Sequence, residues 1–511
     1  MLVHQILFET ADRLPGKPAL LQGDRSLSYS EVAARAQALA ASLQGMGVAP
    51  GDRVALLFPN CMEFVLAYFA VLQLGAMVVP LNNRLAPKEF EYIVNDSGAG
   101  VLIVDKQFWP AYLAFAPGLS KTLAVIHSGG PAPAGAADFA AMCAPGPTPK
   151  GEPALSSDSP ACIMYTSGTT GLPKGAVMSH RNICMNARNC GAHLGYLESD
   201  VTLIVVPLFH VTGLNSQLVA FFHAGGTCAI MTAYNTAEMI AQIARYRVTV
   251  IFKVPTMYSL MLVNPELAKH DLTSLRLAAY GGAPMDPDTI ATLQKRLGVA
   301  LCNAYGLTET SSLTTVNPAC DALRKSASVG LPVSGLQLRV VDEAGNDQPP
   351  DAVGELWIKG PNVVTSYWNK PEATAANLAG GWLKTGDFAR LDEEGYVYIV
   401  DRKKDMINRG GENIYSIEVE AAILSHPQAM EAAVVPRPHS IFGEVVHAFV
   451  VAAPGGSPTE DEIIAHCKIQ IAYFKVPASV SFVTELPRNP GGKVLKNTLR
   501  EMVPPGDPPR R

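Results

Sequence analysis

The sequence lacks the cysteine spacings that hold a metal ion or a disulfide framework. Its nine cysteines are scattered, and no two of them form a CxxC pair. This pattern argues against structural zinc and predicts a protein of a reducing compartment. Because acidic side chains at Glu9 and Asp12 come too early for a secretory signal, we expect a cytoplasmic location.

Charge is also scarce, and neither sign dominates. Asp, Glu, Lys and Arg make up 17% of the 511 residues, and the formal net charge is −5. Without a basic excess there is no electrostatic reason to expect nucleic acid or an anionic membrane as a partner. Hydrophobic residues reach 48%, which is typical of a soluble globular enzyme, and the length requires more than one domain.

No apolar run is both long and uninterrupted. The nearest candidate for a membrane span, residues 64–81, contains Gln73, Gly75 and Pro80. A span needs about 20 consecutive apolar residues. We therefore predict a buried helix up to Leu74, a glycine stop and a short inner strand, with no transmembrane segment.

What the sequence does contain is an alternation of helix and strand patterns, which predicts an α/β fold with a parallel sheet. Residues 31–44 are predicted to form a helix with an apolar stripe, with Ser30 as its N-cap. Residues 53–58 and 101–104 are predicted strands. From about residue 328 to 400 the pattern becomes all-β, as in a small β-barrel or twisted sheet. Residues 401–503 then predict a compact α+β unit, and the proline-rich 504–511 a disordered tail.

One segment combines glycines, hydroxyls and a lysine. Residues 165–175 read Tyr-Thr-Ser-Gly-Thr-Thr-Gly-Leu-Pro-Lys-Gly and follow the apolar run 161–164. Glycines let backbone N–H groups approach an anion, hydroxyls donate hydrogen bonds, and Lys174 adds a charge. This predicts a phosphate cradle, although not of the Walker type, since Lys174 is followed by Gly175 and not by Ser or Thr. A surface loop is the alternative.

Further motifs follow, and each has an ordinary explanation when taken alone. A glycine pair can be a tight turn, a Thr-Glu pair a helix cap, a Gly-Asp pair a solvated turn, and a charged run a linker. In chain order, these motifs are Gly281-Gly282-Ala283-Pro284, Asn303-Ala304-Tyr305-Gly306-Leu307-Thr308-Glu309-Thr310, Lys384-Thr385-Gly386-Asp387, Asp401-Arg402-Lys403-Lys404-Asp405, Asn408 to Asn413, and Pro487-Arg488-Asn489-Pro490-Gly491-Gly492-Lys493.

Taken in order, these motifs resemble those of the adenylate-forming superfamily, which includes acyl-CoA synthetases, aryl-CoA ligases, luciferases and peptide-synthetase adenylation domains. The resemblance extends from about Leu27 to Leu499. It implies a large N-terminal domain, residues 1–400, with two helix-flanked sheets and the β-rich part at about 328–400. A small mobile C-terminal domain, 401–503, would complete the fold, with a hinge at Asp401.

The resemblance also implies an activity and its cofactors. A carboxylic acid attacks ATP to form an acyl adenylate and pyrophosphate, and the thiol of coenzyme A then takes the acyl group and releases AMP. Mg²⁺ would bind Glu309. Lys493, Thr308, Glu309 and Gly411 would be catalytic, with Lys493 serving adenylation and the segment around Gly411 serving thioester formation after the C-terminal domain turns.

Other positions receive binding roles from the same resemblance. The residues implied for ATP and AMP are Thr166, Ser167, Gly168, Thr169, Thr170, Lys174, Gly281, Gly282, Ala283, Asn303, Ala304, Tyr305, Gly306, Thr308, Asp387, Arg402 and Lys493. Those implied for the acyl pocket are His210, Thr212, Gly213, Ser216, Tyr280 and Gly281. His210 could equally be a satisfied core histidine.

The substrate is less constrained than the reaction. Residues 201–222 contain no charged side chain, which disfavours dicarboxylates, and the small residues at 212, 213 and 216 suggest room for a chain. We therefore favour a medium- or long-chain fatty acid, and a place in fatty acid metabolism. Benzoate-, anthranilate- or cinnamate-type acids, or transfer to a carrier protein, are the alternatives. A homodimer stays open, and the absence of GxSxG leaves a serine hydrolase without support.

Overall fold

The computed structural model describes residues 1–166, 172–283, 285–410, 412–488 and 494–505. It divides into two compact units, each of which is made of two separate segments of the chain. The first contains Met1–Gln337 and Ile358–Leu383, and the second contains Leu338–Trp357 and Lys384–Arg511. About half of the β-rich segment 328–400 therefore belongs with the C-terminal part, whereas the sequence predicts that all of it belongs to the N-terminal domain.

An eight-stranded sheet forms the first layer of the N-terminal unit. Its inner strands are parallel, and β9 and β19 are antiparallel additions at one edge. In spatial order it consists of β19 (Ser366–Tyr367), β9 (Lys174–Ser179), β8 (Pro160–Thr166), β4 (Met77–Pro80), β3 (Arg53–Leu57), β5 (Val101–Asp105), β6 (Ala124–Ser128) and β7 (Ala137–Asp138).

The apolar run at 64–81 is a buried helix followed by an inner strand. Helix α3 (Met62–Gln73) is buried at every position from Phe64 to Leu72. Gly75, with φ +71°, then turns the chain into β4. The prediction made for this run is confirmed. Among the described residues, no helix is long and apolar enough to cross a membrane.

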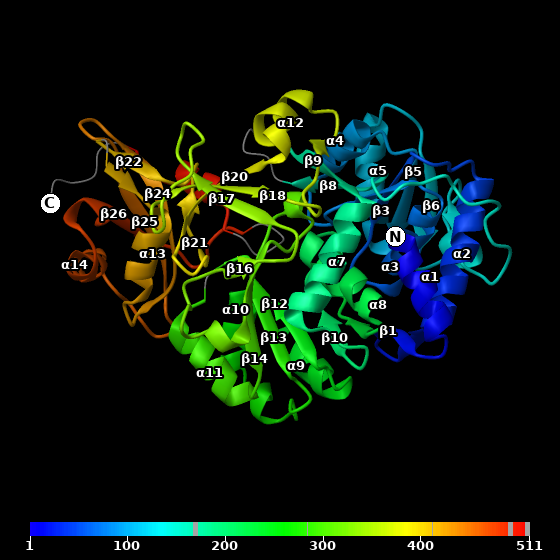
Figure 1. Cartoon of the computed structure of the whole chain (residues 1–511), viewed down its shortest axis with the longest axis horizontal. Helices are drawn as coiled ribbons and strands as arrows, with labels where there is room; N and C mark the ends of the chain where they lie inside the picture. Colours follow the sequence, from blue (N-terminus) through cyan, green and yellow to red (C-terminus); the bar gives the residue numbers. More distant parts are fainter. Residues whose placement is uncertain (167–171, 284, 411, 489–493, 506–511) are drawn as a thin grey trace. The chain divides into compact units, whose positions relative to one another are not determined.

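A nine-stranded sheet forms the second layer of the same unit. Its central strands run side by side in the green part of the chain in Figure 1. In spatial order it consists of β16 (Leu331–Pro332), β15 (Thr315–Asn317), β14 (Ala300–Tyr305), β13 (Leu277–Gly281), β12 (Val250–Lys253), β10 (Val201–Ile204), β11 (Thr227–Ile230), β1 (Pro18–Gln22) and β2 (Arg25–Ser28).

The connections reverse direction at β10. The chain goes from β10 to β11 on one side and then crosses back to β12 on the other side. Such a reversal opens a crevice at the carboxyl ends of the strands, where ligands bind in open α/β sheets. Here β10 and β12 pair only through Thr202 and Val250, so the two strands separate toward their carboxyl ends.

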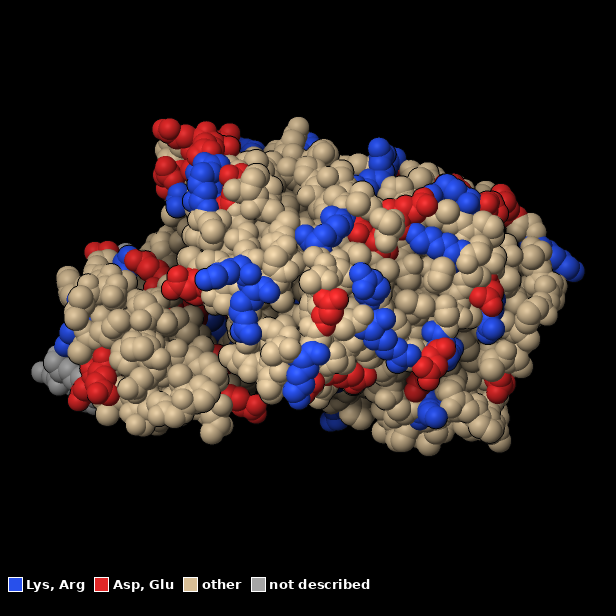
Figure 2. Space-filling view, turned by 90° about the horizontal axis from the view of Figure 1, so that it is seen from below, with Lys and Arg blue, Asp and Glu red and all other residues tan. Residues whose placement is uncertain are grey.

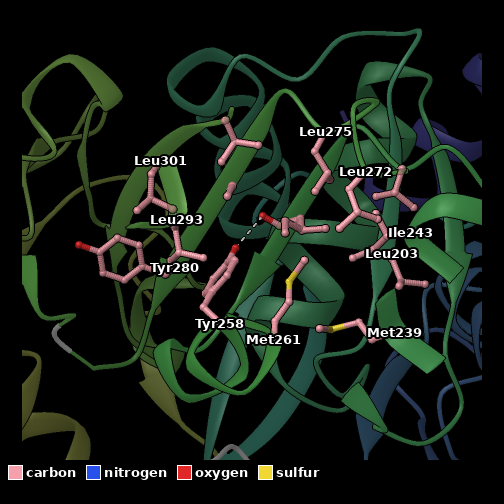
Figure 3. Packing of buried hydrophobic residues seen from close by; sticks show 14 of the residues in the cluster. Leu203, Met239, Ile243, Tyr258, Met261, Leu272, Leu275, Tyr280, Leu293 and Leu301 are labelled. Carbon is pink, nitrogen blue, oxygen red and sulfur yellow. Dashed lines mark hydrogen bonds between the residues drawn. The ribbon is translucent and has the colours of Figure 1, made fainter. Parts of the chain in front are cut away.

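The apolar core beside this sheet is closely packed. Tyr258, Met261, Leu293 and Leu301 lie together there (Figure 3). The Tyr258 hydroxyl donates to the Ala279 carbonyl at 2.8 Å, so burying it leaves no unpaired donor. The helices of this region are α9 (Thr236–Arg245), α10 (Pro255–Val263) and α11 (Pro287–Leu297).

Helix starts follow local capping signals. Ser179 caps α7 (His180–Leu194), as the sequence predicts. The predicted cap at Ser30 is wrong, because helix α2 (Tyr29–Gly45) begins earlier and is capped by Ser28, which forms a capping box with Glu31. Tyr29 is completely buried, and its packing draws the helix start two residues upstream. The remaining α-helices of the described part of this unit are α1 (Val3–Arg13), α4 (Pro87–Ser97), α5 (Trp109–Phe115), α6 (Phe139–Met142), α8 (Ala220–Ala224) and α12 (Pro371–Asn377).

The C-terminal unit is an α+β structure built on two small sheets. The first has the order β17 (Gln337–Val341), β18 (Gly354–Lys359), β20 (Leu383–Leu391), β21 (Val397–Arg402). The second contains β23 (Glu412–Ile414), β22 (Ile407–Arg409), β25 (Gly443–Ala452), β24 (Ala429–His439) and β26 (Ser479–Phe482), with helices α13 (Ser416–Leu424), α14 (Glu460–Gln470) and α15 (Lys496–Glu501). The fold class predicted from the sequence, a large α/β part with a smaller α+β part, is confirmed.

Candidate active site

The predicted phosphate cradle is the connection of a β-hairpin. Strands β8 and β9 pair antiparallel, with Thr166 directly opposite Lys174, and the Thr166 hydroxyl donates to the Lys174 carbonyl at 3.4 Å. The hairpin thus holds both ends of the segment at the end of the eight-stranded sheet. Ser167, Gly168, Thr169 and Thr170 lie outside the described residues.

A second loop carries the predicted Thr308 and Glu309. It leaves β14 at Tyr305 and winds through a short 3₁₀ turn, Thr308–Thr310. A Cβ atom on Gly306 would lie 1.3 Å from the Ser312 carbonyl oxygen, so no other residue fits there. Gly306 therefore allows the two arms of the loop to touch, which brings Thr308 and Glu309 to its tip.

Tyr367 connects these two loops. Its hydroxyl donates to Oε1 of Glu309 at 2.9 Å, and the Lys174 ammonium lies 5.8 Å from the centre of its ring. The Glu309 carbonyl also accepts from the Val364 amide at 2.8 Å. Burial, followed by the charge of Glu309, raises the pKa of Tyr367, so it remains a protonated donor. The structure therefore joins Lys174 and Glu309, which are far apart in sequence, through one buried aromatic ring.

The glycine pair lies at the end of β13, beside the loop that follows β14. Gly281 pairs with Ala304 in register, and a Cβ on Gly281 would lie 2.3 Å from the Ala304 carbonyl oxygen. Gly282 has φ +83°, a left-handed value that favours glycine. Gly282 and Ala283 are exposed, whereas the Asn303 side chain is buried and donates to the Ser328 carbonyl at 3.1 Å. Gly281, Ala304 and Tyr305 thus share one edge of the nine-stranded sheet.

The predicted acyl-pocket residues fall into two groups. His210 and Thr212 are half-buried beyond the carboxyl end of β10, and the Thr212 amide donates to Nδ1 of His210 at 3.3 Å. Burial lowers the pKa of His210 to about 4, so the ring is neutral at pH 7. Tyr280, by contrast, is 1% exposed and packs in the apolar core near Leu293 and Leu301 (Figure 3).

The other two small residues of this group have structural contacts of their own. Gly213 is the second residue of a π-helix, η3 (Thr212–Val219), and a Cβ there would lie 2.4 Å from the Pro207 carbonyl oxygen. Ser216 is completely buried, and its hydroxyl donates to the Ser312 hydroxyl at 2.7 Å. Both positions require a small residue because of these neighbours.

In the C-terminal unit the structure pairs two predicted nucleotide-binding residues. Asp387 on β20 and Arg402 on β21 are cross-strand neighbours, with Nε of Arg402 3.2 Å from Oδ1 of Asp387. Asp387 is 3% exposed. A carboxylate held by a guanidinium keeps further acceptor sites for hydroxyl groups, as ribose recognition requires.

The predicted hinge residue Asp401 is buried in a polar network of the same unit. Its carboxylate accepts from the Ser416 amide and hydroxyl and from the Arg402 amide. Lys496 donates to the Ser416 hydroxyl at 2.5 Å and to Glu420 at 2.6 Å. Burial raises the pKa of Asp401, and the Lys496 charge opposes that rise. Gly411 and Lys493 lie outside the described residues.

Two residues of interest escaped the sequence analysis. Tyr367 stands in a segment without a glycine, histidine or charged motif, and only its place beside β9 joins it to Glu309. Lys253 is 1% exposed, its ammonium donates to the Leu203 carbonyl at 2.6 Å across the split between β10 and β12, and burial lowers its pKa to about 7. The position of Lys253 at the end of an apolar strand was its one available signal.

Surface charge does not single out another site on the face shown in Figure 2. Blue and red side chains are interspersed over that face, and neither sign gathers into a large patch. A mixed surface of this kind provides little long-range steering for a charged macromolecule.

Comparison with known proteins places the chain in a family. Residues 7–368 match the model for the AMP-binding enzyme, and residues 418–493 match the model for the AMP-binding enzyme C-terminal domain. The chain belongs to this family of adenylate-forming acyl-CoA synthetases, so it is an enzyme of the AMP-forming acid–CoA ligase class.

Individual relatives differ in the acids that their names give. A feruloyl-CoA synthase of Amycolatopsis sp is 38% identical over 95% of this chain and 96% of its own. A fatty acid–[acyl-carrier-protein] ligase, ScoC, of Streptomyces coeruleorubidus is 35% identical over 96% of this chain and 94% of its own. The crystal structure of an anthranilate CoA ligase, AuaEII, with anthranoyl-AMP superposes with TM-score 0.92 at 29% identity, covering 98% of this chain and 97% of the other.

Proposed function

We propose that the protein joins a hydrophobic monocarboxylic acid to coenzyme A through an acyl adenylate, with ATP as the second substrate. The observation that carries this proposal is the cluster of Lys174, Tyr367 and Glu309, which joins the β8–β9 hairpin to the 305–312 loop. A cation and a carboxylate held on one buried ring are what the phosphates of ATP and their counter-ion require.

The donor set also fits a magnesium ion. Mg²⁺ prefers one or two carboxylates together with substrate phosphates. Glu309 offers such a carboxylate, of which Oε1 already accepts from Tyr367, and a carboxylate has more acceptor sites than this single bond uses. An ion bound to Glu309 would neutralise charge on the phosphates, while Tyr367 fixes the rotamer of the side chain.

The chain's own residues divide the two steps between them. In the first step the acid carboxylate attacks the α-phosphorus of ATP, the bond to the β-phosphate breaks, and pyrophosphate leaves. Lys493 supplies positive charge to the two anions as they meet, and the Thr308 hydroxyl donates a hydrogen bond to a phosphate. In the second step the thiol sulfur attacks the adenylate carbonyl and AMP leaves, with the segment around Gly411 forming the thiol path and Asp401 the hinge.

For the acid, we put an aryl or arylalkenyl acid of the ferulate type first and a fatty acid second. Taken from the sequence alone, the small residues at 212, 213 and 216 favour a fatty acid. Gly213 and Ser216 are small for other reasons, since one faces a backbone carbonyl and the other bonds to Ser312. The similarity to a feruloyl-CoA synthase and to an anthranilate CoA ligase supports the aryl acid.

The test is a pyrophosphate-release screen of the full chain with ferulate, cinnamate, anthranilate and fatty acids of 8 to 16 carbons, each with and without CoA. We expect acid-dependent pyrophosphate release, AMP as the nucleotide product, and thioester only when CoA is added. Release of ADP, or thioester formation on a carrier protein but not on CoA, would reject the proposal.

A further inference from the structure

The π-helix η3 and the loop that carries Glu309 are bonded to each other at a buried junction. The Asn215 amide donates to the Ser311 carbonyl at 3.0 Å, and the Ser216 hydroxyl donates to the Ser312 hydroxyl at 2.7 Å. Asn215 and Ser216 are completely buried. The junction therefore connects the element that begins at the acid-binding candidates 210–213 to the loop that ends at the nucleotide candidates 308–309.

On the loop side, the junction holds a strained turn. Ser311 has φ 56° and Ser312 has φ 120°, and both values lie where residues with a side chain are rarely found. Backbone strain of this kind persists only where the surroundings impose it, and it gathers at functional sites. Leu313, the next residue, is held on both sides, since its amide donates to Asn186 at 2.8 Å and its carbonyl accepts from Asn362 at 2.7 Å.

On the helix side, the junction stands on a π-helix. Eight residues, Thr212–Val219, are wound in this wider form before the chain continues as α8. π-Helical turns are rare and are found frequently at functional sites. Neighbours anchor Ser216 from the other side, because the Cys190 thiol donates to its hydroxyl at 3.4 Å and the Tyr196 hydroxyl donates to its carbonyl at 3.3 Å.

The junction also leaves hydrogen-bonding capacity unused. Within the described residues, Oδ1 of Asn215 and the hydroxyl of Ser311 are both buried and have no partner. Buried polar atoms are normally paired, so each such exception requires a reason. These two atoms belong to residues that are already joined, because the Asn215 amide donates to the Ser311 carbonyl. The junction therefore contains a donor and an acceptor that its present hydrogen bonds do not use.

We infer that Asn215 and Ser216 are positioning residues that transmit the presence of the acid to the nucleotide loop. An acid bound at 210–213 shifts the start of η3, the Ser216–Ser312 bond carries that shift to the strained turn, and the turn sets Thr308 and Glu309 for ATP. The inference rests on the proposed function, because it takes 210–213 as the acid site. Its consequence is that acid and ATP bind interdependently, which prevents an empty site from aligning ATP for hydrolysis.

The experiment measures binding, so that it does not depend on turnover. The affinity of the full chain for α,β-methylene-ATP with Mg²⁺ is determined by calorimetry, without acid and with saturating ferulate or dodecanoate. For the wild type we expect one of the acids to raise this affinity about tenfold. Ser216→Ala and Ser312→Ala should each reduce the effect to twofold or less, and the double variant should lose no more than either single variant.

Two further variants separate positioning from simple destabilisation. Ser216→Cys keeps the volume with a weaker donor and should show an intermediate acid effect. Ser97→Ala removes another completely buried serine hydroxyl of the same unit, and should lower the melting temperature without changing the acid effect. An unchanged acid effect in Ser216→Ala, additive losses in the double variant, or no acid effect in the wild type would each overturn the inference.

The proposed function is judged separately. Pyrophosphate release with the same two acids is recorded for the wild type in parallel. Release without any acid effect on nucleotide affinity would leave the ligase function standing and remove the inference. An acid effect on affinity without release would support the junction and count against the ligase function.

Discussion

At the scale of single residues, the site depends on side chains whose properties are set by burial. The Tyr367 hydroxyl donates to Glu309, and burial raises its pKa further above its usual value. His210 is neutral at pH 7, because burial lowers its pKa to about 4. Lys253 is the extreme case, a cation in an apolar core with a single carbonyl partner. Each of these residues yields a different expectation when it is replaced.

Tyr367→Phe should slow adenylation by about 10- to 150-fold, since it removes one hydrogen bond to a carboxylate, worth roughly 1.5–3 kcal/mol. The Glu309 side chain then loses the contact that fixes its rotamer, so a higher Mg²⁺ concentration should be needed for half-maximal rate. Pyrophosphate release against Mg²⁺ concentration measures both effects. Tyr246→Phe is the matched control. It removes a tyrosine hydroxyl that donates to the Gly23 carbonyl at 2.8 Å, outside the 305–312 loop, and it should leave both values unchanged.

Lys253→Met should stabilise the protein at neutral and acidic pH. The pKa of Lys253 is about 7 in the folded chain against 10.5 when unfolded, so the unfolded chain binds the extra proton between these two values. The wild type therefore gains stability as the pH rises from about 7 to 10.5, and below that window it bears the whole cost of burying the ammonium. Removing that cost, less the lost bond to Leu203, should add roughly 2–4 kcal/mol at pH 6.

Urea unfolding at pH 6, 7.5 and 9 measures this prediction. The Lys253→Met variant should show a flatter dependence of unfolding free energy on pH than the wild type. Lys253→Arg, which cannot lose its charge, should be less stable than the wild type at pH 7.5 and 9, where Lys253 can shed its proton. A wild-type stability that falls between pH 7 and 9 relative to the methionine variant would contradict the argument.

At the scale of elements, close backbone approach decides which loops can form. The β8–β9 hairpin, the 305–312 loop and the start of η3 each depend on a position where a side chain would collide with a carbonyl or a neighbouring strand. Gly306 and Gly213 are the two clearest cases, because the obstructing atoms are backbone oxygens that cannot turn away.

Gly213→Ala should destabilise the protein by about 1–3 kcal/mol, the usual cost of overpacking, because its Cβ would lie 2.4 Å from the Pro207 carbonyl and 2.6 Å from that of Val206. It should also weaken acid binding, since η3 begins there. Gly191→Ala is the control: that glycine lies inside α7 with open space around it, and the change should raise stability by about 0.5–1 kcal/mol. Thermal melting and acid titration test both variants.

At the scale of the whole molecule, the two compact units carry different parts of the proposed reaction. The cluster around Glu309 belongs to the N-terminal unit, and Asp387, Arg402 and Asp401 belong to the C-terminal unit. A reaction in two steps suits such a division, because each step can use a different set of residues from the second unit.

Lys493→Ala should abolish acid-dependent pyrophosphate release, by about 100-fold or more, yet leave thioester formation from supplied acyl adenylate and CoA largely intact. In the proposed reaction the lysine acts on the phosphate and carboxylate charges that meet in the first step, and these groups do not react with each other in the second step. Lys468→Ala, an exposed lysine on α14, serves as the control. Equal losses in both half-reactions would remove the assignment of Lys493 to adenylation.

Features of the fold and the site could be predicted from the sequence when the residues that form them are close together in the chain. The apolar strand at 161–164 and the buried helix before Gly75 depend on contiguous residues, so local chemistry was enough to predict them. The phosphate-binding role of residues 165–175 stays a prediction. The cap of α2 was predicted two residues too late, because the packing of Tyr29 and not the apolar stripe determines where that helix begins. The small residues at 213 and 216 were interpreted as space, whereas close neighbours explain them.

The sequence by itself determined the family, the reaction class and the order of the motifs, because these are carried by short contiguous runs of residues. Only the tertiary structure decided which motifs work together. Tyr367 meets Glu309 across 58 positions and Ser216 meets Ser312 across 96, through a paired strand and a π-helix respectively. Such contacts arise because the sheets return distant segments to the same edge, and no local pattern records them.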